Sequence, residues 1–310
     1  MKRIIKPVLA ILLITIVMYN GYQLISYYED ESRSDALNEQ LIAIHICGDE
    51  NEEETDHKAP KETAVPLEHS ETKCEREPMN TAYLVTTSQL TTTIPESEAE
   101  KDKNPSKQME ADTNVVQHTE KHNSGLSSLQ KKNSYCIAWI SIPGTVIDYP
   151  VMHTPDNPGY YLHRNFYGKK ASGGTLFLSE ICDIDRSDNL IIYGHNMKNG
   201  TMFAALTKYK TKSFWEEHPY ITLETADETR TYEVICALAT DVSAGNRFPY
   251  YDFSRASSAK EFDSYVAACK RLAYYDTGVT AEYGEQILTL STCEYTHENG
   301  RLLVIAKRIE

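Results

Sequence analysis

Two residues in the C-terminal half could together carry out cysteine acyl transfer. Cys293 follows an apolar run that ends at Leu290, and His195 follows another that ends at Tyr193. Taken alone, such a cysteine is more typical of packing and such a histidine of a surface or capping position. If the two runs are neighbouring strands of one sheet, however, the thiol and the imidazole face the same edge. A thiolate beside an imidazolium is the nucleophile that acyl transfer requires.

Arg301 is the third candidate and lies eight positions after Cys293. It precedes an apolar run, 302–305, which is typical of another strand. The turn residues 296–300 would fold the chain back as a hairpin and bring the arginine near the cysteine. An isolated arginine at a strand edge is usually a solvated charge. Beside a reactive thiol, its guanidinium could hold the oxyanion of a tetrahedral intermediate.

The elements that would position these residues are short strands and two helices. Eight apolar segments separated by turn residues favour a closed barrel or a sandwich; they are 137–142, 146–149, 174–178, 189–193, 220–224, 230–239, 285–290 and 302–307. Helical periodicity occurs at 202–209 and at 257–274. The second helix is expected to be a long crossover before the cysteine strand, with one face formed by Phe262, Val266, Cys269 and Leu272.

The N-terminus has the pattern of a signal-peptide core or a membrane anchor. Three basic residues precede the apolar run 7–19. We favour an anchor because 20–23 has no small-residue cleavage site and the apolar character continues to Ile25, a length sufficient for a bilayer. The acidic residues at 29–31 follow the run, so the N-terminus is predicted inside and the rest of the chain outside.

The next segments differ sharply in composition. Residues 34–46 have the apolar spacing of an amphipathic helix, which either packs on the folded domain or forms a stalk near the membrane. The following residues are polar and acidic without a sustained period, which is typical of a flexible tether. We therefore predict an anchor at 1–27, a membrane-proximal helix at 28–47, a tether at 48–134 and a catalytic domain at 135–310.

Charge and cysteine spacing exclude some classes of function. The chain of 310 residues has 45 acidic and 31 basic side chains, a formal charge of -14, which argues against nucleic acid as a partner. Its seven cysteines include no CxxC pair and no zinc-like Cys/His spacing, so neither a metal site nor a cofactor is expected. A domain outside the cell that contains them either uses a free thiol or works where conditions are not strongly oxidising.

The motif Thr289-Leu290-Ser291-Thr292-Cys293, followed by Arg301 and preceded by Tyr193-Gly194-His195-Asn196-Met197, resembles the sortase family. The resemblance covers about 137–309. The order His, Cys, Arg is specific, because papain-like enzymes have the cysteine before the histidine.

Three further features look like the class B branch of the family: the run 196–203, the continuation Cys293-Glu294-Tyr295 and the long helix before the cysteine strand. Class B enzymes carry N-terminal helices packed on the barrel. The long acidic tether departs from the family pattern and leaves the position of 34–46 open.

The resemblance implies a mostly β fold with added helices, namely a closed eight-stranded barrel. It also implies that Cys293 cleaves a C-terminal sorting motif of a secreted protein after threonine and forms a thioester. A cell-wall or pilin amine then resolves the thioester. His195 would be the general acid and base, and Arg301 would stabilise the oxyanion. Thr289, Ser291 and Glu294 could line the substrate groove.

Two alternatives remain open from the sequence. A membrane-anchored cysteine peptidase would use the same three residues but transfer the acyl group to water. An idle surface-binding module would have the same barrel without needing the three residues. The sequence contains all three residues, but it does not separate transfer from hydrolysis.

Overall fold

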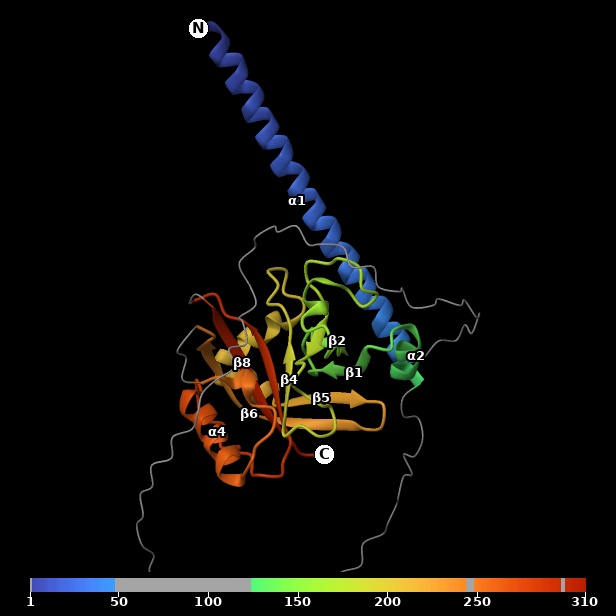
Figure 1. Ribbon diagram of the computed structural model, residues 1–310, viewed down its shortest axis with the longest axis vertical. Coiled ribbons are helices and arrows are strands. Elements are labelled where there is room, and N and C mark those ends of the chain that lie inside the picture. The colour runs from blue at the N-terminus through green and yellow to red at the C-terminus, as the bar shows by residue number, and fades with distance from the viewer. Residues whose placement is uncertain (1, 48–123, 244–247, 297–298) are drawn as a thin grey trace, which may run out of the picture. The chain divides into compact units, whose positions relative to one another are not determined.

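The computed structural model describes residues 2–47, 124–243, 248–296 and 299–310, with only the backbone of 2–11 and 124 (Figure 1). Within these residues the strands are β1 Cys136–Ser141, β2 Asp148–Met152, β3 Leu176–Leu178, β4 Asn189–Tyr193, β5 Tyr220–Thr225, β6 Thr229–Asp241, β7 Ile287–Cys293 and β8 Gly300–Arg308. The helices are α1 Lys2–Cys47, α2 Ser124–Lys132, α3 Lys212–Glu217 and α4 Ala259–Leu272, and the 3-10 helices are η1 Tyr160–His163, η2 Phe203–Lys210 and η3 Tyr250–Asp252.

The strands close into a barrel in the order β1-β2-β3-β4-β7-β8-β6-β5. Two pairs, β2 with β3 and β4 with β7, are parallel, and the others are antiparallel. Apolar side chains from every strand fill the interior, because alternate residues of a strand point to the same face. The predicted closed eight-stranded barrel is therefore confirmed.

The parallel pairing of β4 and β7 requires a crossover, which contains α4 (Figure 1). The helix begins after Ser258, whose hydroxyl accepts a hydrogen bond from the Glu261 amide. Its buried face consists of Phe262, Tyr265, Val266 and Cys269. The expectation that Leu272 shares this face is wrong, since this last helical residue is 40% exposed.

Two other boundaries differ from the sequence prediction. Cys293 is the last residue of β7 instead of following the strand, because its pairing with β8 continues through Cys293. The segment expected as a helix at 202–209 is the 3-10 helix η2. Met202, which precedes η2, has a positive φ of 56°, a left-handed backbone conformation that is unfavourable for a non-glycine residue.

The helix α1 is continuous from Lys2 to Cys47, where the sequence predicted an anchor and a separate amphipathic helix. Its C-terminal part packs on the barrel: Leu41 is buried in a cluster with Trp139 and Tyr161. The ring of His45 stacks on Trp139 with centroids 4.2 Å apart. Residues 34–46 therefore pack on the folded domain. Within the described part of the chain, no helix is long and apolar enough to cross a membrane.

The helix α2 lies in residues that the sequence analysis assigned to the tether, so that assignment extends too far toward the barrel. Leu126 and Leu129 are fully buried in the same cluster as Leu41 and Trp139. Burial of two leucines against an existing apolar surface stabilises a helix too short to form alone. The rest of the predicted tether, 48–123, lies outside the described residues.

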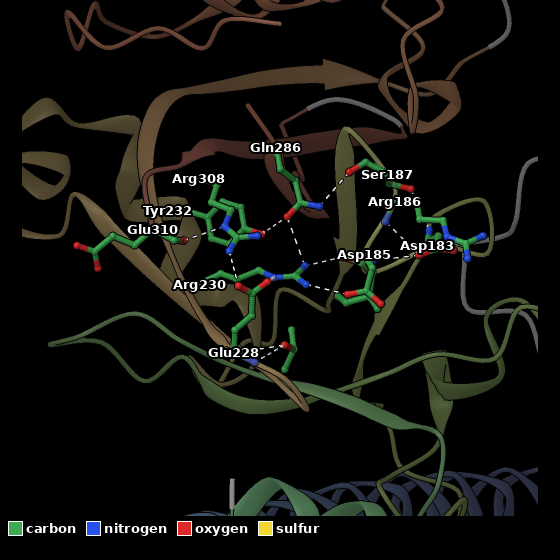
Figure 2. Close-up of polar contacts among 12 residues, drawn as sticks. Asp183, Asp185, Arg186, Ser187, Glu228, Arg230, Tyr232, Gln286, Arg308 and Glu310 are labelled. Atoms are coloured by element: carbon green, nitrogen blue, oxygen red, sulfur yellow. Dashed lines mark hydrogen bonds and ion pairs between the residues drawn. The ribbon is translucent and has the colours of Figure 1, made fainter. Parts of the chain in front are cut away.

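A polar network lies at the end of the barrel where β4 and β7 begin (Figure 2). The Arg230 side chain is 4% exposed, and its guanidinium pairs with Asp185 at 2.8 Å and Glu228 at 2.7 Å. Gln286, which precedes β7, accepts a hydrogen bond from the Tyr232 hydroxyl at 2.6 Å and donates one to the Ser187 carbonyl at 3.0 Å. These contacts connect the starts of β6 and β7 to the segment before β4.

Candidate active site

The parallel ladder between β4 and β7 brings His195 and Cys293 to one edge of the barrel. Tyr193 pairs with Ser291, and the next residue, Gly194, donates its amide to the Ser291 carbonyl at 3.1 Å. The carboxyl ends of parallel neighbours meet at the same edge, so the residues that follow Tyr193 lie beside the end of β7. The condition set in the sequence analysis, that the two strands are neighbours in one sheet, is therefore met.

Side-chain hydrogen bonds join the two strand ends beyond the ladder. The Asn196 amide nitrogen donates to the Cys293 carbonyl at 3.0 Å. The Thr292 hydroxyl donates to the Gly194 carbonyl at 2.7 Å. The residues on either side of His195 are therefore bonded to the cysteine strand, and these bonds fix the relative position of the two backbones.

Arg301 is the direct cross-strand partner of Cys293 in the antiparallel β7–β8 ladder. The hairpin is held by the Glu294 amide, which donates to the Gly300 carbonyl at 2.9 Å. Directly opposite residues of an antiparallel pair have Cβ atoms about 5 Å apart. A guanidinium in this position is within reach of a group bound to the Cys293 sulfur.

Cys293 also differs from the other described cysteines of the barrel in its surroundings. It is half-buried, whereas Cys136, Cys182, Cys236 and Cys269 are buried. Burial raises the pKa of Cys136 to about 12 and that of Cys182 to about 11, so both stay protonated at neutral pH. Among the described cysteines of the barrel, Cys293 is therefore the least buried.

The environment of His195 favours its neutral form. The ring is half-buried, and burial lowers its pKa below the ordinary value. Its Nε2 lies 2.8 Å from the Leu162 carbonyl oxygen, and its face stacks on His163 with ring centroids 5.3 Å apart. A neutral imidazole has a ring nitrogen with a free lone pair, which can accept a proton.

Thr289 and Ser291 do not line an open groove, in contrast to the expectation from the sequence. Both side chains are buried: Thr289 donates to the Asn189 side chain at 2.8 Å, and the Ser291 hydroxyl is 2.8 Å from that of Tyr250. Both faces of this central strand are covered, so its hydroxyls find partners inside the protein. They hold β7 to β4 and to η3.

Glu294 is only 7% exposed and is used within the protein. Its carboxylate accepts a hydrogen bond from the Lys210 ammonium at 2.7 Å and another from the Thr296 amide at 2.9 Å. Burial opposes ionisation of Glu294, but the bonds from Lys210 and Thr296 outweigh it and lower the pKa to about 2. The residue after the nucleophile candidate is therefore a fixed anion that ties the β7–β8 turn to η2.

This ion pair predicts an acid-sensitive contribution to stability. A carboxyl whose folded pKa of about 2 lies below its ordinary 4.5 stabilises the fold above pH 4.5, and the contribution is lost as pH falls toward 2. In Lys210→Met, we expect unfolding free energy at pH 7 to fall by on the order of 1 kcal/mol, since Lys210 is 37% exposed and screened by solvent. The difference from wild type should shrink at pH 3.

Urea denaturation at the two pH values measures this effect. Lys198→Met is the matched control, because it removes one exposed lysine charge. Equal losses for both variants at both pH values would contradict the assigned role of the Lys210–Glu294 pair.

Sequence reasoning missed the contacts of Leu162 and His163 with His195, and those of Lys210 with Glu294 and Tyr250 with Ser291. Each contacts its partner across a long stretch of chain: Lys210 and Glu294 are 84 positions apart, and Leu162 and His195 are 33 apart. No local spacing could have indicated these pairs. The periodicity of a strand says which side chains share a face, but it does not say which loop covers them.

Comparisons with known proteins agree with this geometry. A family model described as the sortase domain matches residues 140–309, more than half of the chain. Sortase B of Listeria monocytogenes is 35% identical over 191 residues, which cover 59% of this chain and 74% of that protein. Sortase B of Staphylococcus aureus is 28% identical over 201 residues, covering 63% of this chain and 79% of that protein.

Solved structures show the same similarity. A Staphylococcus aureus sortase B–substrate complex superposes with a TM-score of 0.56 at 27% identity, covering 61% of this chain and 87% of that chain. Sortase B from Bacillus anthracis in complex with AAEK1 gives a TM-score of 0.53 at 32% identity, covering 60% of this chain and 85% of that one. With the family model, the relatives and the barrel in agreement, the chain belongs to the sortase family as a cysteine transpeptidase of class B.

Proposed function

We propose that Cys293 is the nucleophile of this transpeptidase, that His195 is its general acid and base, and that Arg301 stabilises the oxyanion. The observation that supports this most is the pairing at one barrel edge: Cys293 lies directly opposite Arg301, and Asn196, next to His195, donates to the Cys293 carbonyl. These two observations support a site that combines a thiol, an imidazole and a guanidinium, the groups that acyl transfer needs.

In the first step, the Cys293 sulfur attacks the carbonyl carbon of a threonine in the sorting motif of a secreted protein. Negative charge moves to the carbonyl oxygen, where the Arg301 guanidinium can donate to it. His195 then protonates the leaving amine as the carbon–nitrogen bond breaks, which leaves a thioester on Cys293. In the second step, an amine of a cell-wall peptide or a pilin attacks the thioester carbonyl and His195 accepts the amine proton. The carbon–sulfur bond then breaks, which forms the new amide and releases the Cys293 sulfur.

The neutral state of His195 fits the start of this cycle. Because burial lowers its pKa, the ring has a lone pair available to take the thiol proton at neutral pH. Burial raises the pKa values of the Cys136, Cys182 and Cys269 thiols, which opposes thiolate formation there. This difference supports Cys293 as the reacting thiol.

The proposal includes a single-pass anchor in the cell membrane, with the N-terminus inside and the catalytic domain outside. It is supported by the basic flank and the apolar run that continues to Ile25. Large apolar side chains between Leu12 and Tyr28 are exposed, which suits contact with lipid. Protease added to intact cells should release the barrel, whereas recovery of full-length enzyme in the medium would rule out the anchor.

The function is tested by following the fate of the acyl group. The full-length enzyme in membranes is incubated with sorting-motif peptides, with and without an added primary amine. Mass spectrometry is expected to show a thioester on Cys293 and, when the amine is present, a peptide–amine conjugate. If only the hydrolysed acid forms at every amine concentration, the chain acts as a peptidase.

A further inference from the structure

We propose that His163 is a positioning residue for His195, and that it works with the Leu162 carbonyl to make Nδ1 of His195 the nitrogen that transfers the proton. The inference rests on the proposed role of His195 in acyl transfer. The two positioning groups are adjacent in η1 and meet the same imidazole from different directions: the Leu162 carbonyl at an edge nitrogen and the His163 ring at a face.

The first step concerns the tautomer of His195. Its Nε2 lies 2.8 Å from the Leu162 carbonyl oxygen, and a carbonyl oxygen can only accept a hydrogen bond. Nε2 must therefore carry a hydrogen. A neutral imidazole has one N–H, so Nδ1 is left with the lone pair and becomes the only ring nitrogen that can act as a base.

The second step concerns the ring face. His163 stacks on His195 with centroids 5.3 Å apart and an angle of 24° between the ring planes. A flat ring against one face of His195 excludes water from that face. It also hinders rotation of the imidazole about its Cβ–Cγ bond. This contact keeps the Nε2–H directed at the Leu162 carbonyl, so the orientation of Nδ1 is maintained through repeated proton transfers.

The third step is that η1 is itself held in place. The Thr175 amide donates to the Tyr161 carbonyl at 3.0 Å, and the Ala171 amide donates to the His163 carbonyl at 3.1 Å. Gly174 has a φ of +59°, and a Cβ there would lie 2.3 Å from the Leu162 carbonyl oxygen. Only glycine permits this close approach, so the Gly174 backbone packs directly against the Leu162 carbonyl and restricts the position of η1.

Charge also acts between the two rings. Burial lowers the pKa of His163, and the nearby Lys170 ammonium lowers it further. Both imidazoles are therefore neutral at neutral pH, and protonation of one disfavours protonation of the other. Other reactive or charged groups near this edge are Cys293 on β7, Arg301 on β8 and the Lys210–Glu294 ion pair that follows Cys293. His163 thus adds an aromatic cover without adding a fixed positive charge beside the base.

The test compares two substitutions of His163 by nitrogen NMR of His195 in the full-length enzyme. His163→Asn removes the ring. We expect the pKa of His195 to rise toward its ordinary value, because water reaches the uncovered face, and the Nε2–H tautomer to lose population. Turnover kcat should fall by roughly 10-fold with KM little changed, a smaller loss than the ~10²-fold that misplacement of a reacting group can cause.

His163→Phe retains a flat ring but cannot titrate. It should keep the Nε2–H tautomer of His195 and a kcat close to wild type, with a smaller rise in the His195 pKa than the asparagine variant shows. His218→Asn is the control, since the His218 ring contacts Phe214 and bonds to the Pro143 carbonyl instead. It should leave the His195 spectrum unchanged.

Two results would overturn the inference: an Nδ1–H tautomer in the wild-type enzyme, or a wild-type His195 spectrum and pH–rate profile in His163→Asn. A phenylalanine variant as impaired as the asparagine variant would also count against stacking. Failure of the proposed function is seen separately. If His195→Gln retains turnover, His195 is not the general acid and base. The NMR measurement still decides, independently of turnover, whether His163 fixes the tautomer of the His195 ring.

Discussion

Cys293→Ala is expected to abolish formation of the acyl-enzyme while leaving the barrel folded. In the proposed mechanism the Cys293 sulfur forms the bond to the substrate carbonyl, and alanine has no group that can replace it. Loss of the nucleophile in a catalytic unit of this kind costs on the order of 10⁶-fold in kcat. The side chain is half-buried at the last position of β7, so its removal takes away little packing. Mass spectrometry after incubation with sorting-motif peptide measures the thioester.

Two other cysteines provide matched controls. Cys47→Ala changes an exposed thiol at the end of α1 and should affect neither activity nor unfolding. Cys236→Ala changes a fully buried thiol of β6, so it should lower the unfolding temperature while thioester formation continues. A thioester still formed by folded Cys293→Ala would show that another cysteine is the nucleophile.

Arg301→Ala is expected to lower turnover by about 10²-fold to 10³-fold, or roughly 3 to 4 kcal/mol of transition-state stabilisation. The reason is that negative charge would develop on the substrate carbonyl oxygen during the proposed attack by Cys293. A guanidinium opposite the cysteine can meet this charge with hydrogen bonds that strengthen as the charge grows. Arg301→Lys retains the charge but loses the planar fork, so it should recover only part of the activity.

Arg308→Ala is the control for this prediction. Arg308 lies at the other end of β8, where it pairs with Glu228 at 2.6 Å in the network of Figure 2. Its loss should reduce stability and leave the turnover of the folded enzyme near wild type. Steady-state kinetics on folded, monodisperse variants make the comparison. Near wild-type turnover in Arg301→Ala would remove Arg301 from the site.

The two arginines have different environments although they belong to one strand. Arg308 bonds to Glu228, a carboxylate whose pKa is lowered chiefly by the hydrogen bonds from Arg308 and Arg230. At Arg301 the neighbour across the ladder is Cys293, and the side chain bonds to the Gly300 carbonyl at 3.0 Å. A guanidinium that is bonded to a neutral carbonyl keeps donors available for a substrate oxygen, because it has five N–H groups.

The polarity pattern of the sequence was sufficient to predict the strands and the α4 crossover. It also placed His195, Cys293 and Arg301 near strand ends. Strands and amphipathic helices are encoded locally: a β-branched apolar run, a turn residue or a helical period is visible within a few positions. The hairpin that pairs Cys293 with Arg301 is also local, since the two residues are separated by one turn. The motif at 289–293 then indicated the family.

Tertiary structure alone decided which distant segments surround the site. The parallel register of β4 and β7, the contact of Leu162 and His163 with His195, and the Lys210–Glu294 pair join residues between 32 and 98 positions apart in sequence. Such contacts form only when the barrel closes and buries both partners. For the same reason, Thr289 and Ser291 lie in the interior, although the sequence suggested that they line a groove. Burial of Leu126 and Leu129 likewise stabilises a helix in a segment whose sequence predicted a tether.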